Sequence, residues 1–307
     1  MKHILITGAC GQLGNEMQLQ AAHAPEYRWF FTDITAAEPT ADRPFAVTTL
    51  DITDQFAVEA FVQKNAIDTI VNCAAYTAVD RAESDEAKAL MLNATAPGYL
   101  AAAIARRGGN IIQISTDYVF DGTAHTPYTE EQPTCPASAY GRTKLAGEEA
   151  VAAATDGAMI IRTAWLYSRF GSNFVKTMLR LGREKSELGV IFDQIGTPTY
   201  ARDLAAVILT VIQRGIRPGI YHFTNEGVTS WYDFTLAIHR LAGITTCRVR
   251  PLHTAEYPTP ATRPHYSVLD KTKLKQTYAI DIPHWQDSLG ECIKELTPIP
   301  LNEALSL

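Results

Sequence analysis

The sequence predicts an α/β protein built on a doubly wound parallel sheet, with a smaller C-terminal lobe beside it. Short apolar segments alternate with amphipathic helical stretches through the first half of the chain, and a glycine-rich turn follows the first apolar segment. After about residue 165, proline-containing loops interrupt the helical stretches. A chain that repeats strand, helix and strand needs right-handed crossovers, which produce a parallel sheet with helices on both faces.

The expected strands are short and apolar, which is typical of strands buried on both faces of a sheet. They span residues 3–7, 27–32, 68–72, 110–115 and 158–163. The expected helices carry apolar residues three or four positions apart. The first runs from the glycine-rich turn to about residue 23, and the others span residues 54–65, 84–107, 139–153, 173–181, 201–213 and 231–242.

Composition and charge exclude several classes of protein. With 307 residues, 46% of them apolar and 20% charged, the chain can bury a sizeable core and is not wholly disordered. A net charge of −6 without a basic stripe argues against a nucleic-acid partner, and no apolar run approaches the ~20 residues that cross a bilayer. The five cysteines are dispersed without a CxxC pair, which favours a reducing compartment, so the cytoplasm is the expected location.

The glycine-rich turn has the form GxxGxxG, with Gly8, Gly11 and Gly14 placed between the first strand and the first helix. Such a turn lets the backbone approach a pyrophosphate, and the helix N-terminus then offers free N–H groups and the positive end of its dipole. Because the turn follows a strand and opens a helix, the sequence predicts a dinucleotide site here.

Acidic residues after the expected second strand point to the adenosine end of this dinucleotide. Asp33 ends that strand, where a carboxylate accepts hydrogen bonds from ribose hydroxyls. Asp51 and Ile52 follow in a region expected to flank the adenine. No arginine directly follows Asp33, which favours acceptance of NADH, and the sequence leaves the choice between NADPH and NADH open.

A tyrosine and a lysine four residues apart, Tyr140 and Lys144, predict a proton donor. On a helix the two side chains share a face, and the ammonium group is expected to pull the tyrosine pKa from about 10 towards neutrality. Thr116 follows the expected fourth strand, and ligands of such sheets bind at the carboxyl ends of the strands. Thr116 is therefore expected to hydrogen-bond a substrate oxygen while Tyr140 transfers the proton.

These features also predict how the chain divides. Residues 1–165 are expected to form an NAD(P)-binding Rossmann domain, to which residues 201–224 return as a helix and a strand. Residues 166–307 are expected to build mainly a substrate-binding lobe, whose longest loop spans residues 251–264. The boundary is discontinuous, so residue 165 is an approximate cut.

Several longer motifs resemble the extended short-chain dehydrogenase/reductase family, and the likeness runs nearly from end to end. The most specific are STDYVFDG at residues 115–122 and DQIGTPT at residues 193–199. The other matching segments are GQLG at 11–14, VNCAAYTAVD at 71–80, YGRTKLAGE at 140–148, RTAWLY at 162–167, NFVKTM at 173–178 and RP at 263–264. The resemblance implies a reductase of the 4-keto group of a nucleotide-linked deoxysugar, with NADPH or NADH as cofactor.

The resemblance also implies roles for individual residues. Tyr140 is implied as the proton donor, Lys144 as the partner that adjusts its pKa, and Thr116 as the group that tunes the transfer. Besides Gly8, Gly14 and the catalytic pair, the implied cofactor contacts are Gly11, Gln12, Leu13, Asp33, Asp51, Ile52, Ala75, Tyr76 and Thr77. The implied substrate contacts are Thr116, Asp117 and Trp165, whose indole would be a platform for the sugar or the base.

The residue after Asp117 separates two reactions within the family. Nucleotide-sugar 4,6-dehydratases resemble this region but carry a glutamate there, which handles proton transfer during elimination of water. This chain has Tyr118, which cannot act as a carboxylate base. The resemblance therefore implies ketone reduction, which needs only a hydride and one proton.

Some relatives dimerise through a divalent metal held by acidic residues. Glu16 matches one such ligand, whereas Arg202 replaces another, so no metal is expected here. A nucleotide sugar is the expected small-molecule partner, and the resemblance leaves a homodimer open.

Two alternatives stay open. One is another enzyme of the family, either a nucleotide-sugar epimerase or a reductase of a different 4-keto sugar. The other is a non-catalytic NADP-binding module that resembles the regulatory subunit of methionine adenosyltransferase. The presence of Thr116, Tyr140 and Lys144 together argues against the second, because a binding module need not keep all three.

Overall fold

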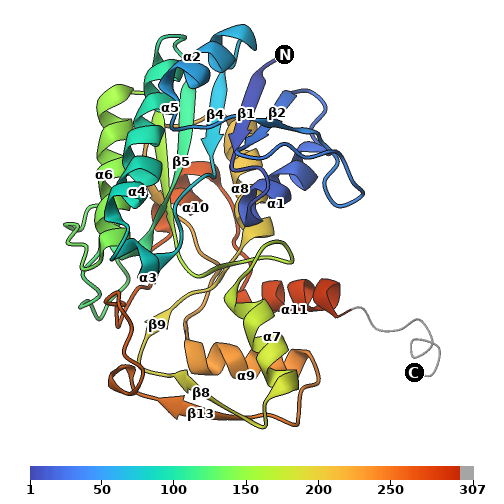
Figure 1. Cartoon of the computed structure of the whole chain (residues 1–307), viewed down its shortest axis with the longest axis vertical. Helices are drawn as coiled ribbons and strands as arrows, with labels where there is room; N and C mark the ends of the chain where they lie inside the picture. The colour runs from blue at the N-terminus through green and yellow to red at the C-terminus, as the bar shows by residue number, and fades with distance from the viewer. Residues whose placement is uncertain (298–307) are drawn as a thin grey trace.

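A seven-stranded parallel sheet forms the centre of the protein in the computed structural model, which describes residues 1–297 (Figure 1). Its strands, in spatial order, are β3 (Val47–Thr49), β2 (Arg28–Asp33), β1 (His3–Thr7), β4 (Thr69–Asn72), β5 (Asn110–Thr116), β6 (Ala158–Thr163) and β11 (Gly219–His222). Every neighbouring pair in this sheet is parallel. The strand order reverses between β1 and β4, and this confirms the predicted doubly wound sheet.

Helices cover both faces of the sheet (Figure 1). One face carries α1 (Gln12–Ala21), α8 (Ala201–Arg214) and α10 (Thr272–Tyr278), and the other carries α2 (Gln55–Lys64), α5 (Ala96–Ala105) and α6 (Ala139–Ala154). Successive side chains of a strand point to opposite faces. In β1, Ile4 and Ile6 accordingly join one hydrophobic core while Leu5 joins the other.

The helix expected over residues 84–107 is divided into three parts. They are α4 (Glu86–Leu90), a π-helical turn over Met91–Thr95, and α5. Pro97 lies at the start of α5 and has no N–H to donate to the carbonyl group four residues earlier. The wider π turn accommodates that missing bond, which explains why a continuous pattern of helix formers gives an interrupted helix. A short helix, α3 (Val79–Ala82), precedes this run.

The smaller lobe packs around its own core of aromatic and aliphatic side chains. Its helices are α7 (Phe174–Glu184), α9 (Trp231–Leu241) and α11 (Trp285–Leu296). Three strand pairs complete it: β7 (Leu166–Tyr167) with β10 (Thr199–Tyr200), β9 (Ile195–Gly196) with β12 (Thr229–Ser230), and β8 (Glu187–Ile191) with β13 (Arg248–Leu252). The loop expected at residues 251–264 therefore begins inside β13, where Pro251 is tolerated because β13 pairs on one side alone in the described part of the chain.

The main sheet takes side chains from two late segments. Ile208 of α8 and Leu274 of α10 lie in the same core as Ile4. The sequence predicted that residues 201–224, which contain α8, return to the sheet. It did not predict α10 and α11. Division of the chain at residue 165 stays a prediction, and the last ten residues of the expected lobe, 298–307, lie outside the described residues.

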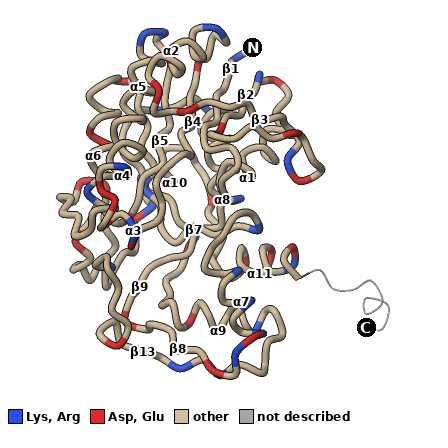
Figure 2. Tube along the Cα trace, in the orientation of Figure 1, with Lys and Arg blue, Asp and Glu red and all other residues tan. Residues whose placement is uncertain are grey.

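Two further observations concern the surface and the helices. Lys and Arg residues are interspersed with Asp and Glu along the trace (Figure 2). No helix within residues 1–297 has the length and the apolar character needed to cross a membrane.

Candidate active site

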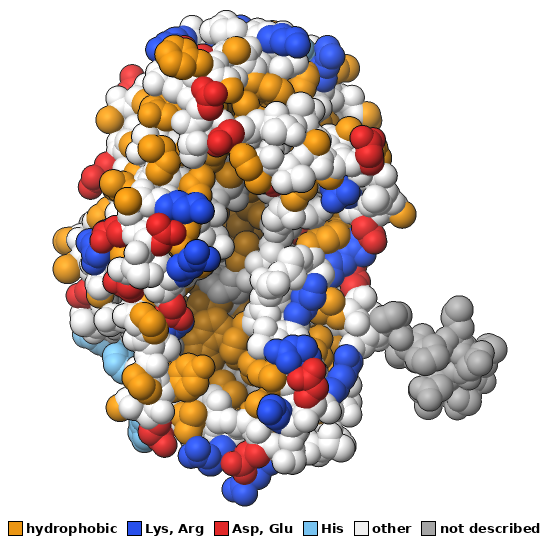
Figure 3. Space-filling model, in the orientation of Figure 1, with side chains coloured by type: hydrophobic (Ala, Val, Ile, Leu, Met, Phe, Trp, Pro, Cys, Tyr) orange, Lys and Arg blue, Asp and Glu red, His pale blue; other side chains and the backbone are white. Residues whose placement is uncertain are grey.

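A cleft of about 1350 Å³ opens at the carboxyl ends of the sheet strands, between the sheet and the smaller lobe. Figure 3 shows this face hollowed there, with hydrophobic side chains in the hollow. Most of the predicted site residues line it: Gly8, Gly11, Gln12, Leu13, Asp33, Asp51, Ile52, Ala75, Thr77, Thr116, Asp117, Tyr140, Lys144 and Trp165. Gly14 and Tyr76 lie outside this lining, Tyr76 being buried with its backbone N–H donated to Asn93.

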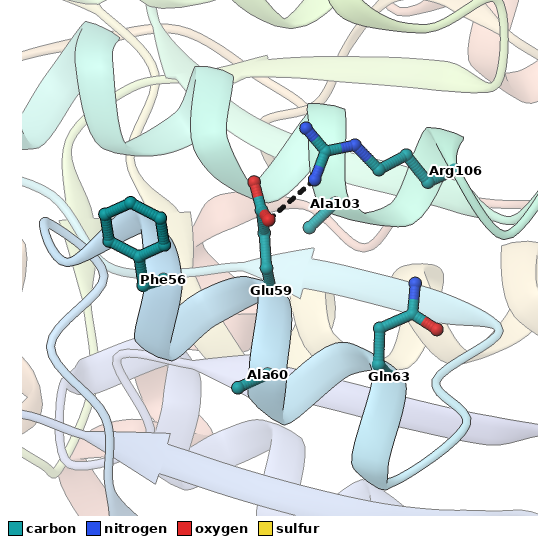
Figure 4. A pocket seen from close by; sticks show the side chains of 6 residues that line it. All are labelled: Phe56, Glu59, Ala60, Gln63, Ala103 and Arg106. Carbon is teal, nitrogen blue, oxygen red and sulfur yellow. Dashed lines mark ion pairs between the residues drawn. The ribbon is translucent and has the colours of Figure 1, made fainter.

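A second hollow, of about 330 Å³, lies on the outer surface of α2 and α5 (Figure 4). Phe56, Glu59 and Arg106 are among its lining residues, and the Arg106–Glu59 ion pair measures 2.6 Å. None of the predicted site residues lies there, so the larger cleft is the candidate active site.

The glycine-rich turn allows two close backbone approaches. A Cβ atom on Gly8, whose φ is +64°, would lie 2.6 Å from the amide nitrogen of Ala74, and one on Gly14 would lie 2.2 Å from the Gly8 carbonyl oxygen. Helix α1 follows with no side-chain cap at Gly11, so its first N–H groups are free at the cleft. These groups fit a dinucleotide pyrophosphate, which supports the predicted cofactor site.

The carboxylate of Asp33 stands at the end of β2 in the same cleft. One of its oxygens accepts from the backbone N–H of Cys10 at 2.9 Å and the other from Ile34 at 2.7 Å. Each oxygen keeps a lone pair for a ribose hydroxyl. Arg43 was not predicted from the sequence. It lies close enough to Cys10 to lower the pKa of that thiol, which burial and Asp33 raise.

The segment after β7 folds over the start of α1. Asn173 donates from Nδ2 to Gln12 Oε1 at 2.9 Å, and Gly171 and Ser172 line the cleft beside it. These contacts join residues far apart in the chain, so no local sequence signal could have predicted them. They place a lobe segment directly over the dinucleotide turn.

The catalytic candidates meet at one point of the cleft. Helix α6 begins after Ser138, whose hydroxyl accepts from the Gly141 N–H at 3.1 Å, and it carries Tyr140 and Lys144 on the face that lines the cleft. Thr116 ends β5 beside them. Lys144 is 3% exposed, and its Nζ donates to the Ile114 carbonyl at 2.6 Å.

The pKa values of the tyrosine and lysine are governed by burial. Burial raises the pKa of Tyr140 to about 12, although a hydrogen bond with Thr116 opposes this. Burial lowers the pKa of Lys144 to about 8, against the opposite effect of Glu148. The expected lowering of the Tyr140 pKa by Lys144 is not found, because burial and the nearby Asp117 carboxylate both raise it. A tyrosine with this pKa is protonated at neutral pH, as a proton donor must be.

Asp117 is buried next to these groups. Its Oδ1 accepts from the Thr116 hydroxyl at 3.0 Å. Burial raises the pKa of Asp117 to about 6, even though hydrogen bonds from nearby hydroxyls lower it. The carboxylate is therefore ionised at neutral pH but titrates in the mildly acid range.

Aromatic side chains from the smaller lobe line the far side of the cleft. The rings of Trp165 and Trp231 stack at 3.5 Å between centroids and 9° between planes, with Phe174 4.5 Å from Trp231. Trp165 has a φ of +48°, and a Cβ on Gly196 would lie 2.7 Å from its ring. The motif DQIGTPT thus contributes the glycine that leaves space for Trp165, whereas Trp231 carried no sequence signal beyond an ordinary helix start.

Tyr118 fills the position that separates the two reactions weighed from the sequence. It lines the cleft with its ring edge-on to Tyr140, 5.4 Å between centroids. Burial raises its pKa, so the side chain is a neutral phenol at physiological pH. No carboxylate stands at this point of the described structure.

Glu16, the residue matched to a metal ligand, is fully buried on α1. It accepts from the Ser168 hydroxyl at 2.7 Å, and Arg202 lies 3.5 Å from its second oxygen. Arg202 also contacts Glu295 at 2.5 Å, so a guanidinium group stands between the two acids. Among residues 1–297 no group of three or more His, Cys, Asp or Glu side chains is arranged to hold a metal ion.

Comparison with known proteins gives consistent matches along nearly the whole chain. Residues 1–298 match the family described as RmlD substrate binding domain. The chain is 39% identical over 308 residues to a dTDP-4-dehydrorhamnose reductase of Burkholderia thailandensis, a match covering 95% of this chain and 98% of that protein. It is 42% identical over 294 residues to a probable dTDP-4,6-dihydroxy-2-methyloxan-3-one 4-ketoreductase of Streptomyces antibioticus, covering 95% of each.

A solved structure shares the fold in detail. The crystal structure of a dTDP-4-dehydrorhamnose reductase from Bacillus anthracis in complex with NADP superposes with a TM-score of 0.86. The two chains are 36% identical, and the match covers 96% of this chain and 99% of that one.

Proposed function

We propose, on the premise that this chain belongs to the RmlD substrate binding domain family, that it reduces the C4 ketone of dTDP-4-dehydro-L-rhamnose to give dTDP-L-rhamnose, with NADPH or NADH. It is thus an NAD(P)H-dependent oxidoreductase. One observation carries the proposal: Thr116, Tyr140 and Lys144 converge on a cleft that also contains the dinucleotide turn.

Tyr140 is the proton donor in this proposal. Its raised pKa keeps the phenol protonated until the C4 oxygen gains negative charge, and that oxygen then takes the proton. Thr116 orients the same oxygen from the end of β5, its hydroxyl proton turning from Asp117 Oδ1 to the C4 oxygen. When bound, the reduced nicotinamide supplies the hydride for the C4 carbon.

Lys144 stabilises the phenolate that Tyr140 leaves behind. An ammonium group held one helical turn away lowers the energy of that anion, and its fixed bond to the Ile114 carbonyl keeps it in place. Because the Lys144 pKa is about 8, the lysine is mostly charged at pH 7 and becomes neutral in alkaline solution.

The substrate is held by Asp117 and by the tryptophan pair. The Asp117 carboxylate accepts from sugar hydroxyls, and Trp165, backed by Trp231, gives an apolar wall for the sugar or the base. On the cofactor side, Gly11, Gln12 and Leu13 would hold the pyrophosphate and Asp33 the ribose. The roles of Ala75, Tyr76 and Thr77 as cofactor contacts stay predictions.

The reaction type follows from Tyr118. Elimination of water from a 4-keto intermediate needs a base for the C5 proton and an acid for the departing C6 hydroxyl. A neutral phenol at position 118 does not supply that base. Ketone reduction needs neither group, so reduction is favoured over dehydration.

Location and assembly complete the proposal. The reaction takes place in the cytoplasm, in keeping with five cysteines that are all free thiols. A homodimer is the proposed assembly, and sedimentation of the purified protein tests it.

The test of function is a paired incubation. The protein and NADPH are mixed with dTDP-glucose in one tube and with the epimerised 4-keto sugar in another, and the products are separated by chromatography. We expect dTDP-rhamnose in the second tube alone. A 4-keto-6-deoxy sugar formed in the first tube contradicts the proposed reaction type. Adding other dTDP-4-keto sugars separates the proposed substrate from that named for the Streptomyces antibioticus relative.

A further inference from the structure

A buried cluster of three polar side chains lies behind Lys144 and has no part in the steps above. Glu148 follows Lys144 by one turn of α6, Ser115 lies on β5 and Arg162 on β6. None of the three is more than 3% exposed. Glu148 and Arg162 belong to the motifs YGRTKLAGE and RTAWLY, and neither touches the reacting atoms.

Both oxygens of the Glu148 carboxylate are held. Oε1 accepts from the Ser115 hydroxyl at 2.5 Å and from Arg162 Nε at 2.9 Å, and Oε2 accepts from Arg162 Nη2 at 2.7 Å. Ser115 directly follows Ile114, the residue whose carbonyl accepts from Lys144. The cluster and the lysine are thus anchored to the same strand end.

Stability alone is a poor explanation for this cluster. A buried ion pair loses about as much hydration energy as it gains, and well-packed apolar side chains often serve equally well. The geometry nevertheless places the carboxylate on the same helical face as Lys144, at i+4.

We propose that Glu148 is a positioning residue for the reduction, and that the Ser115–Glu148–Arg162 cluster keeps Lys144 charged and directed at the end of β5. The inference rests on the proposed function, since it serves the stabilisation of the Tyr140 phenolate. Burial favours the neutral lysine, and Glu148 is the group that opposes this effect on the Lys144 pKa.

The other ionisable groups near Lys144 come from four strands of the sheet. Arg162 on β6 carries a positive charge, which Glu148 offsets by direct contact. Beyond it on β11, His222 is neutral because burial and Arg162 lower its pKa to about 3. Asp117 after β5 is the second carboxylate of the site, and Cys73 after β4 stays a thiol because burial raises its pKa to about 12.

The helices that pack on α6 add little charge at this point. The π turn and α5 contain no charged side chain. Glu83, after α3, accepts from the Ala139 N–H at the start of α6, and Glu86 of α4 pairs with Arg142 on the exposed side. Lys88 of α4 lines the cleft. Glu148 is thus the carboxylate that faces Lys144 from its own helix.

Two substitutions that change the charge near Lys144 in opposite directions test the proposal. Glu148→Gln keeps the shape of the side chain but removes its charge, so the alkaline limb of the kcat profile should move down by roughly one pH unit, which lowers kcat at pH 8 about fivefold. Arg162→Gln leaves Glu148 without its cation, so the same limb should move up. A role confined to folding would not move the limb in opposite directions.

A binding measurement makes the test independent of turnover. The affinity of the ligand-free variants for NADPH is measured by protein fluorescence across the same pH range, because Lys144 lines the cofactor cleft. The pH at which affinity falls should shift with the kinetic limb. Ser115→Ala also removes a donor that partly neutralises the Glu148 carboxylate, so it should shift the limb upward by less than Arg162→Gln does, and it keeps the test usable if Arg162→Gln does not fold.

The matched control is Glu16→Gln. Glu16 is also buried, also accepts from a serine and also faces an arginine, but it lies on α1 away from Lys144. This variant should leave the alkaline limb in place in both the kcat profile and the NADPH affinity. An unmoved limb in Glu148→Gln, or a limb that fails to rise in Arg162→Gln, overturns the inference. Wild-type protein that binds NADPH but reduces no 4-keto sugar would instead contradict the proposed function.

Discussion

The two sides of the cleft are built in different ways. The polar wall, comprising Thr116, Tyr140 and Lys144, comes from the end of β5 and one face of α6. Backbone hydrogen bonds of the sheet and of the helix fix the positions of these residues. The polar wall is therefore rigid for the same reason that the sheet is rigid.

The aromatic wall comprises Trp165, Phe174, Trp231 and Phe234, which come from three segments: the residue before β7, the start of α7, and α9. Ring stacking, together with the space that Gly196 leaves beside Trp165, holds the three segments against one another. We therefore expect reaction chemistry and substrate recognition to depend on different walls of the cleft. Changes in the polar wall should act on kcat, and changes in the aromatic wall on KM.

The largest effect is expected at Tyr140. Tyr140→Phe removes the proton donor while keeping the ring, so kcat should fall about 10²–10⁴-fold with little change in NADPH affinity. Steady-state kinetics and fluorescence titration measure the two quantities. Tyr99→Phe on α5, outside the cleft lining, is the control. Near-normal turnover by Tyr140→Phe would remove the polar wall from the chemistry.

Lys144→Met should rank second and should affect two quantities together. It removes the ammonium group that stabilises the phenolate, so we expect kcat to fall about 10²-fold, and NADPH to bind several-fold more weakly. If kcat falls while affinity stays the same, then Lys144 acts on Tyr140 alone and does not reach the cofactor ribose.

Breaking the aromatic wall tests the other half of the comparison. Trp231→Ala leaves Trp165 without its stacking partner, so KM for the nucleotide sugar should rise about tenfold while kcat changes less than about threefold. Trp231→Phe preserves an aromatic face and should recover most of the loss. A fall in kcat without any rise in KM would show that the two walls are not separable.

The pH profile of the wild-type enzyme should have two limbs. Asp117 loses its charge below its pKa of about 6, which weakens contact with sugar hydroxyls, and Lys144 loses its proton above about 8. Activity should therefore be highest between these values and fall on either side. Asp117→Asn should abolish the acid limb alone, and an acid limb that persists in that variant excludes Asp117 as its source.

The smallest effect concerns cofactor choice. The wild-type enzyme should use NADH within about tenfold of NADPH, because Asp33 accepts ribose hydroxyls and Arg43 lies near the same turn. Arg43→Ala should raise KM for NADPH about fivefold and leave KM for NADH nearly unchanged. Equal changes for both cofactors would place Arg43 away from the adenosine ribose.

The sequence predicted the polar wall better than the aromatic wall, for a physical reason. Tyr140 and Lys144 are one helical turn apart, and Thr116 ends a strand, so local periodicity places all three. Trp231 and Asn173 reach the cleft through contacts between distant segments, which periodicity does not encode.

The predicted direction of the Tyr140 pKa shift was wrong for a similar reason, because burial depends on contacts between distant segments. The pKa of Tyr140 was expected to fall because Lys144 is near it, and it rises because the folded chain removes water from the phenol. How much water a group loses depends on every segment packed around it. The sequence therefore predicted which groups meet, while the direction of the Tyr140 shift required the packed structure.

The backbone of Trp165 carries an evolutionary consequence. A residue with a side chain and a positive φ costs about 1–2 kcal/mol relative to glycine at the same place. Trp165→Gly should thus relieve conformational strain while removing a wall of the site, and the net change in melting temperature shows which is larger. A descendant released from its substrate would be free to drift towards glycine here. If Trp165 contacts the substrate as proposed, its indole at a positive φ is a compromise between stability and activity.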